Sequence, residues 1–178
     1  AASDVYKRQV QEEVTYQCGC RNIHFKDIHL QKKRQTALSI HFDHDQYSRS
    51  VYPGAEMPVQ ENLIFENLVS EGELECLVRS ITPVDTVKIM GSAIGDSRIE
   101  LECLPELRDC YPDTHILLIG NTFRAEKKME LVRCGEGRRC RLTMAGNAAL
   151  HAIFKPWTNG TVELERSDMA VSAGGVKR

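Results

Sequence analysis

The chain has 178 residues, of which 42% are hydrophobic and 27% are charged, so it has enough apolar residues for one folded domain. This composition excludes an intrinsically disordered chain, and the formal net charge of -2 gives no general affinity for nucleic acid or anionic membranes. No apolar run approaches the length of about 18 residues that a transmembrane helix needs.

Both ends of the chain are set apart from the predicted domain. Residues 1–17 have no periodicity, and we interpret them as a tail or as a scar left by cloning or sequence assembly. They contain no apolar signal-peptide segment, so a secretion signal is expected upstream of this sequence. Residues 166–178, which end in a glycine-containing run, are interpreted as a flexible tail. The predicted domain therefore covers residues 18–165.

Strand patterns dominate this domain. Alternating or continuous apolar segments lie at residues 37–42, 63–65, 74–81, 86–90, 98–103, 115–120 and 129–134. Their inward positions predict a core that contains Val78, Ile99, Leu101, Ile116, Leu118 and Leu131. Ala145 to Phe154 is predicted as a short helix, which Pro156 would end. Strands at a spacing of about 10 residues, with turns between them and no visible internal repeat, favour a mostly β small barrel or sandwich.

Cysteine usage indicates the compartment. The seven cysteines are Cys18, Cys20, Cys76, Cys103, Cys110, Cys134 and Cys140. They form no Cys-x2-Cys pair of the kind that holds structural zinc, and their spread favours disulfides in a secreted protein. The odd count implies one free thiol or a partner outside this chain. A cytosolic β-protein or enzyme with incidental thiols stays open as an alternative.

A glycosylation sequon agrees with secretion. Asn159-Gly160-Thr161 makes Asn159 a candidate N-glycosylation site of an extracellular glycoprotein.

Candidate metal ligands and catalytic residues are few. His41, Asp43 and Asp45 would share one face of a strand and are weak candidates for a metal site, but we interpret them as a polar strand end. The other histidines stand alone in the sequence, and no Gly-x-Ser-x-Gly elbow is present. A cysteine–histidine pair stays open, because such partners meet only in the fold. We expect no catalytic residues, no metal and no cofactor, and therefore no enzyme.

Positive charge is concentrated in residues 124–141. The basic residues are Arg124, Lys127, Lys128, Arg133, Arg138, Arg139 and Arg141. If they converge on one face, they would bind a sulfated glycosaminoglycan such as heparin, by the counterion release that governs polyanion binding. The alternative is an ordinary charged edge, because glutamates are interleaved with these residues.

Several motifs between Cys76 and Trp157 resemble one family of extracellular modules. They are Ile99-Glu100-Leu101-Glu102-Cys103, His115-Ile116-Leu117-Leu118-Ile119-Gly120-Asn121, Lys128-Met129-Glu130-Leu131-Val132-Arg133-Cys134 and Phe154-Lys155-Pro156-Trp157, with Cys18-Gly19-Cys20 upstream. Together they resemble the netrin-like (NTR) domain of tissue inhibitors of metalloproteinases, netrins, secreted Frizzled-related proteins and meteorins.

The resemblance implies a fold and a function. The expected fold is a small OB-like Greek-key barrel with a disulfide-tethered N-terminal segment, in which Cys18 pairs with Cys103 and Cys20 with Cys134. The expected function is a non-catalytic extracellular binding module that acts through its surface on a protein partner or a glycosaminoglycan. The alternative is a secreted metalloproteinase inhibitor, which would require Cys18 to be an exposed N-terminus.

Overall fold

The computed structural model of the chain describes residues 20–31, 36–40, 59–71, 74, 76–124, 129–150, 154–157 and 162–172. These residues form two β-sheets, in which every pair of neighbouring strands is parallel. Among them no helix is long and apolar enough to span a membrane.

The two sheets differ in size. The larger sheet has ten strands: β1 (His24–Lys26), β2 (His29–Leu30), β4 (Leu63–Glu66), β5 (Val69–Ser70), β7 (Thr86–Met90), β8 (Ala93–Ile94), β10 (Thr114–Ile119), β11 (Thr122–Arg124), β13 (Cys140–Leu150) and β15 (Val162–Ser172). The smaller sheet has five: β3 (Thr36–Ile40), β6 (Cys76–Ser80), β9 (Ile99–Leu101), β12 (Met129–Cys134) and β14 (Phe154–Trp157). A single 3-10 helix, η1 (Pro105–Cys110), follows β9 among the described residues.

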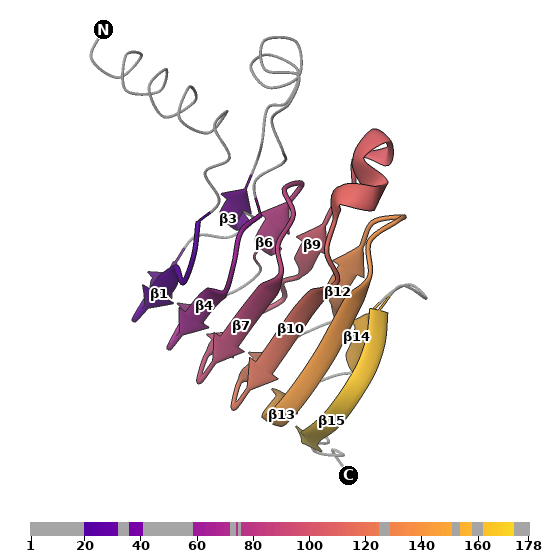
Figure 1. Ribbon diagram of the computed structural model, residues 1–178. Helices are drawn as coiled ribbons and strands as arrows, with labels where there is room; N and C mark the ends of the chain where they lie inside the picture. The colour runs from indigo at the N-terminus through magenta and orange to yellow at the C-terminus, as the bar shows by residue number, and fades with distance from the viewer. Residues whose placement is uncertain are drawn as a thin grey trace, which may run out of the picture.

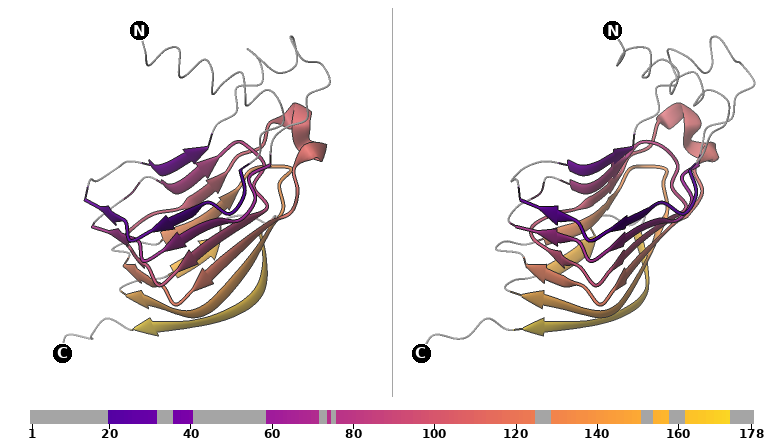
Figure 2. Two further views of the ribbon diagram at one scale, coloured as in Figure 1. Left: turned by 60° about the vertical axis from the view of Figure 1, so that its left-hand side comes forward. Right: turned by 90° about the vertical axis from the view of Figure 1, so that its left-hand side faces the viewer.

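The order of pairing shows that the chain winds into a solenoid. After β1, β2 and β3 the chain returns to place β4 beside β1, β5 beside β2 and β6 beside β3. The next turns repeat this course through β7–β9, β10–β12 and β13–β14, and β15 begins a last turn on β13. We call these turns the first to sixth coils. Figures 1 and 2 show them stacked from the indigo strands to the yellow one.

One corner of each of the first five coils is built in the same way. The residue between the first two strands has a positive φ angle in each case, at Asp27, Asn67, Gly91, Gly120 and, within β13, Gly146. Aspartate, asparagine and glycine are the residues that tolerate this left-handed conformation best.

Buried amides stack beside this corner. The Asn121 amide donates to the Ile89 carbonyl at 2.8 Å, and its Oδ1 accepts the Ser92 backbone N–H at 3.0 Å. Asn147 repeats the arrangement one coil later, donating to the Leu118 carbonyl at 2.7 Å and accepting the Asn121 backbone N–H at 2.9 Å. The hydrogen bonds therefore tie neighbouring coils together where the ladder bends.

The core lies between the sheets and follows columns of aligned residues. One column is Phe25, Phe65, Ile89, Leu118 and Met144. The six predicted core residues, Val78, Ile99, Leu101, Ile116, Leu118 and Leu131, are all fully buried, so that prediction is confirmed.

Two fold predictions are wrong. The OB-like Greek-key barrel would need antiparallel pairs, whereas all strands here pair in parallel with the next coil. Alternation identifies a strand but not the direction of its partner, so the sequence pattern fits both. The predicted helix from Ala145 to Phe154 is also wrong, because its first part continues β13 and its end begins β14. Gly146 and Asn147 form the corner there.

Strand β15 runs to Ser172, so regular structure extends beyond residue 165, where the domain was expected to end.

Candidate functional site: an arginine cluster on the smaller sheet

The outer face of the five-stranded sheet carries a row of charged side chains. Glu100 in β9 is aligned with Arg79 in β6 on one side and with Arg133 in β12 on the other. These residues alternate along their strands with buried positions such as Ile99 and Val132, so they point away from the core. Parallel pairing thus places one carboxylate between two guanidinium groups.

A third arginine joins this row. Arg79 Nη2 and Arg98 Nε lie 3.2 Å and 3.1 Å from Glu100 Oε2, and Arg133 Nη1 lies 3.4 Å from Glu100 Oε1. The Glu100 side chain is only 14% exposed, whereas those of the three arginines are 31–45% exposed. We call Arg79, Arg98 and Arg133 around Glu100 the arginine cluster. Its carboxylate forms the floor and its guanidinium groups form the rim.

A buried thiol completes the floor. The Cys76 Sγ donates to Glu100 Oε2 at 3.3 Å. Burial raises the pKa of the Cys76 thiol, and this hydrogen bond raises it further, so the thiol is neutral and a poor nucleophile. Burial alone would raise the pKa of Glu100, but the hydrogen bonds from Cys76 and Arg79 and the charge of Arg98 outweigh it and hold that pKa below its ordinary value of 4.5. Glu100 is therefore a carboxylate at neutral pH.

Two further carboxylates flank the rim. Glu102 lies 3.8 Å from Arg79 Nε, and Glu130 lies 3.7 Å from Arg133 Nη2. Both are half-exposed and both distances exceed those to Glu100, so these contacts are weak surface ion pairs. A guanidinium group has five N–H donors in a planar fork. Such forks donate paired hydrogen bonds to sulfate, carboxylate or phosphate.

The predicted basic segment does not form one surface. Arg133 lies in the arginine cluster, whereas Arg141 in β13 of the larger sheet pairs with Glu165 at 3.4 Å and Arg139 pairs with Asp113 at 3.2 Å. Arg124 is exposed at the end of β11, and Lys127 and Lys128 lie outside the described residues. The convergence on one face that polyanion binding by this segment would require is therefore not seen for Arg133, Arg139 and Arg141, because β12 and β13 belong to different sheets.

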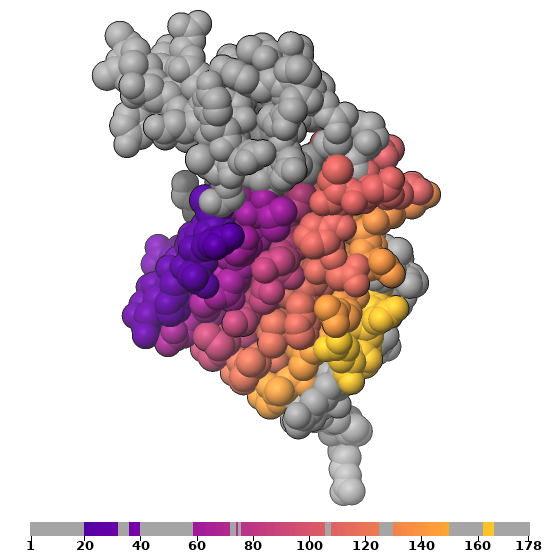
Figure 3. Space-filling model, viewed as in Figure 1, coloured from indigo at the N-terminus to yellow at the C-terminus, as the bar shows by residue number. Residues whose placement is uncertain are grey.

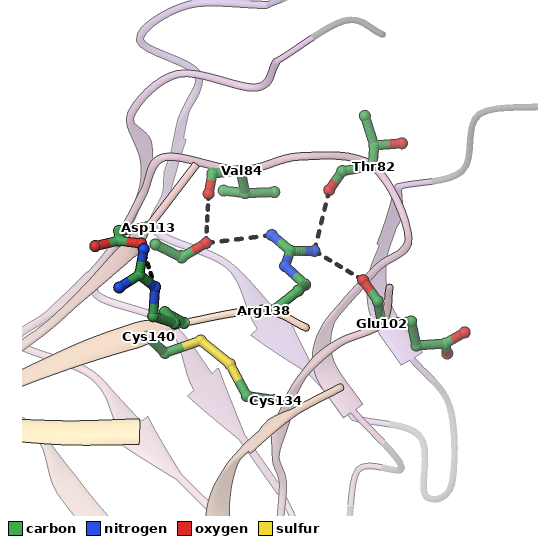
Figure 4. Close-up of a disulfide and its surroundings, with 9 residues drawn as sticks. Thr82, Val84, Glu102, Asp113, Cys134, Arg138 and Cys140 are labelled. Atoms are coloured by element: carbon green, nitrogen blue, oxygen red, sulfur yellow. Dashed lines mark hydrogen bonds and ion pairs between the residues drawn. A yellow bond between two sulfur atoms is a disulfide. The ribbon is translucent and has the colours of Figure 1, made fainter. Parts of the chain in front are cut away.

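Arg138 itself is fully buried, and Figure 4 shows its surroundings. Its Nη1 donates to the carbonyls of Glu102 at 3.0 Å and Thr82 at 3.4 Å, and its Nη2 donates to Thr114 Oγ1 at 3.2 Å. The guanidinium carbon also lies 4.7 Å from the centre of the Tyr111 ring. Burial lowers the pKa of Arg138 to about 10, so it keeps its charge at neutral pH. Arg138 therefore cannot contact a ligand on the surface.

The disulfide of the structure closes the loop that carries Arg138. Cys134 at the end of β12 is bonded to Cys140 at the start of β13. The pairing of Cys20 with Cys134 that the netrin-like resemblance implied is therefore wrong, and Cys20 is a free thiol, as are Cys76 and Cys110. Cys103 Sγ lies 3.6 Å from the Leu104 carbonyl, and Cys18 lies outside the described residues, so its pairing stays a prediction.

The other sequence candidates are either outside the described residues or engaged elsewhere. His41, Asp43, Asp45 and Asn159 belong to the first group. The histidines of the described part pair with glutamates, as in His24–Glu66, His29–Glu71 and His115–Glu165. Within the same part, no group of three histidine, cysteine, aspartate or glutamate residues is arranged to hold a metal ion.

Comparisons with known protein families, with curated proteins and with solved structures found no match for this chain. The candidate site therefore stands on its own geometry. The sequence interpretation missed Arg79 and Arg98, because a charge on an outward strand position is the ordinary pattern of a half-buried sheet. What singles these residues out is their convergence on Glu100, which only the parallel register creates.

Proposed function

We propose that this chain is a non-catalytic extracellular binding module that engages a polyanionic ligand, of the sulfated glycosaminoglycan class, through the rim of the arginine cluster. The observation that carries the proposal is the arrangement of three partly exposed guanidinium groups above one largely buried carboxylate. A largely buried carboxylate orients the arginines, and the exposed parts of their side chains can donate to a sulfate.

Three further features support this proposal. Cross-linked cysteines such as Cys134 and Cys140 fit an oxidising, extracellular compartment. The thiol nearest to the cluster, Cys76, is buried and protonated, which suits a structural part in the floor rather than a nucleophilic one. A regular sheet face holds its side chains at fixed spacing, which suits a linear polymer with repeated charges better than a small molecule.

The flanking glutamates oppose the binding of a polyanion. Glu102 and Glu130 reduce the local positive potential, so the ligand must displace them from Arg79 and Arg133. Exposed pairs of this kind contribute about 0–1 kcal/mol each, which is small compared with several sulfate contacts. The affinity should therefore be modest and should fall steeply as salt rises.

The experiment compares two variants with the same loss of charge. Arg98→Gln/Arg133→Gln removes two arginines of the cluster, and Arg139→Gln/Arg141→Gln removes two exposed arginines outside it. We expect the wild type and the second variant to be retained on heparin-agarose and the first to elute at clearly lower salt. Thermal melting of all three proteins controls for unfolding.

Two outcomes would overturn the proposal. Equal loss of retention in both variants would mean that net charge alone decides binding. Elution of the wild type in the flow-through at physiological salt would leave a protein partner as the ligand of this surface.

A further inference from the structure

The two ends of the solenoid leave core columns uncovered. In the interior coils, Val87, Ile116 and Leu142 form a fully buried column. Leu164 of β15 continues this column after Leu142, yet it is 40% exposed. At the opposite end, the inward residues of the first coil are only partly buried, namely Ile23, Phe25, Leu30 and Leu38. Apolar side chains that face along the stack are therefore accessible at both ends.

The backbone at both ends also has unused pairing capacity. Among the described residues, β15 pairs only with β13, and β1 and β2 pair only with β4 and β5. The first part of β13 pairs with β10 and its last part pairs with β11. Its partner β15 therefore lies, as a single strand, at the end of both strand columns, the one that starts with β1 and the one that starts with β2. Figure 3 shows the first coil in indigo and the start of β15 in yellow at opposite ends of the stacked bands. Such edges are templates for a further strand.

Because all strands are parallel, the first-coil end of one copy matches the β15 end of another copy rather than a second first-coil end. Every strand of the stack runs in one direction, so a second copy shifted along the stack presents β1 and β2 to β15 in the same parallel geometry that β15 presents to β13. Two like ends whose inward faces stay on the same side would instead meet as antiparallel strands. A heterologous contact of this kind joins each copy to the next without closing.

Charge favours the same arrangement. Side chains of the first coil contact glutamates of the second coil at 2.9–3.0 Å, in the pairs Arg21–Glu61, His24–Glu66, Lys26–Glu66 and His29–Glu71. The last coil exposes Glu163 at the other end of the stack, together with Glu165, whose carboxylate also contacts Arg141 and His115 of the preceding coils. A second copy would thus place carboxylates on the free side of a coil that already binds carboxylates on its inner side. This complementarity indicates a copy of the same chain as the partner.

We propose that copies of this chain stack head to tail, with β1 and β2 of one copy pairing in parallel with β15 of the next. The contact covers Leu164 of one copy with the partly buried apolar residues of the other's first coil. Stacking continues the hydrogen-bond ladder and the core columns across the junction, and it produces linear assemblies rather than closed dimers.

The test uses charge reversal at each end of the full chain. Arg21→Glu/Lys26→Glu makes the first coil acidic, and Glu163→Lys/Glu165→Lys makes the last coil basic. Sedimentation velocity of the wild type should show a concentration-dependent series of species. Each double variant should raise the dissociation constant at least about tenfold, because like charges then meet at the junction. The quadruple variant, in which both ends are reversed, should associate as the wild type does.

Controls keep the test independent of folding. Circular dichroism and melting check each variant, and Leu164→Asn weakens the junction without changing charge, so it should reduce association in the same direction. A wild type that stays monomeric into the high micromolar range would overturn the proposal. So would an Arg21→Glu/Lys26→Glu variant that associates normally, since this result indicates pairing of two like ends. Failure of the quadruple variant to recover association would overturn it as well.

Discussion

Arg138 and the arginine cluster are held in opposite ways. Arg138 is fully buried and binds two backbone carbonyls, a hydroxyl and an aromatic face. Arg79, Arg98 and Arg133 are partly exposed and share the carboxylate of Glu100. The first arrangement uses the guanidinium group to satisfy backbone acceptors inside the fold, and the second presents it to solvent. The same type of residue therefore serves the stability of the fold in one case and, in our proposal, recognition in the other.

The largest expected effect is the loss of Arg138. Arg138→Met leaves the Thr82 and Glu102 carbonyls without their donor in a buried site, so it should lower the free energy of unfolding by about 2–4 kcal/mol. The matched variant Arg98→Met removes a partly exposed guanidinium and should cost about 1 kcal/mol or less. Urea denaturation measures both. Equal losses would contradict the distinction between the two arginines.

The disulfide should act together with Arg138. Cys134→Ala/Cys140→Ala opens a short loop and should lower the free energy of unfolding by about 2 kcal/mol in the chain-entropy model. Because the same loop carries Arg138, the loss should be smaller when Arg138→Met is already present. A double-mutant cycle based on urea denaturation measures this coupling, and strictly additive losses would show that the bond and the arginine act independently.

The smallest effect concerns Glu100 and depends on pH. Glu100→Gln should cost about 1 kcal/mol at neutral pH, because the three arginines lose their shared carboxylate. The pKa of Glu100 is lowered in the folded protein, so its contribution is complete above the ordinary value of 4.5 and is lost as pH falls below it. The difference in melting temperature between wild type and variant should therefore shrink in acid. The loss of melting temperature caused by Arg138→Met should not shrink in acid, because none of the hydrogen-bond partners of that guanidinium group is a carboxylate. A Glu100→Gln deficit that stays constant in acid would contradict this assignment.

The strands were largely predictable from the sequence, but their arrangement was not. Alternation at residues 98–103 and 129–134 and the apolar run at 115–120 correspond to β9, β12 and β10. The coils went unnoticed because aligned residues such as His24, Ile64, Lys88 and Leu117 recur at unequal spacing. The different lengths of chain between aligned strands obscure the repeat. One recurring signal is the corner residue with positive φ, but aspartate, asparagine and glycine occupy such positions in ordinary turns as well.

The candidate site was less predictable than the fold. Arg133 was singled out for its local density of charge, but its partners Arg79 and Glu100 come from two earlier coils. Arg138 was predicted on the surface because charge usually lies there. Its burial depends on acceptors supplied by Thr82, Glu102 and Thr114. These residues are far from Arg138 in the sequence, so their proximity to it could not be predicted. In a solenoid, neighbours on the surface are separated by a whole coil.

In the part of the chain that the structure describes, each coil pairs only with the coil before it and the coil after it. Loss of structure can therefore spread only along one dimension, from a coil to its neighbour. Amide hydrogens should exchange fastest in β1, β2 and β15 and slowest in β7 and β10, which have a paired strand on both sides. A lesion in the middle of the stack would not melt the molecule at once but would divide it into two shorter stacks, each with a new fraying end.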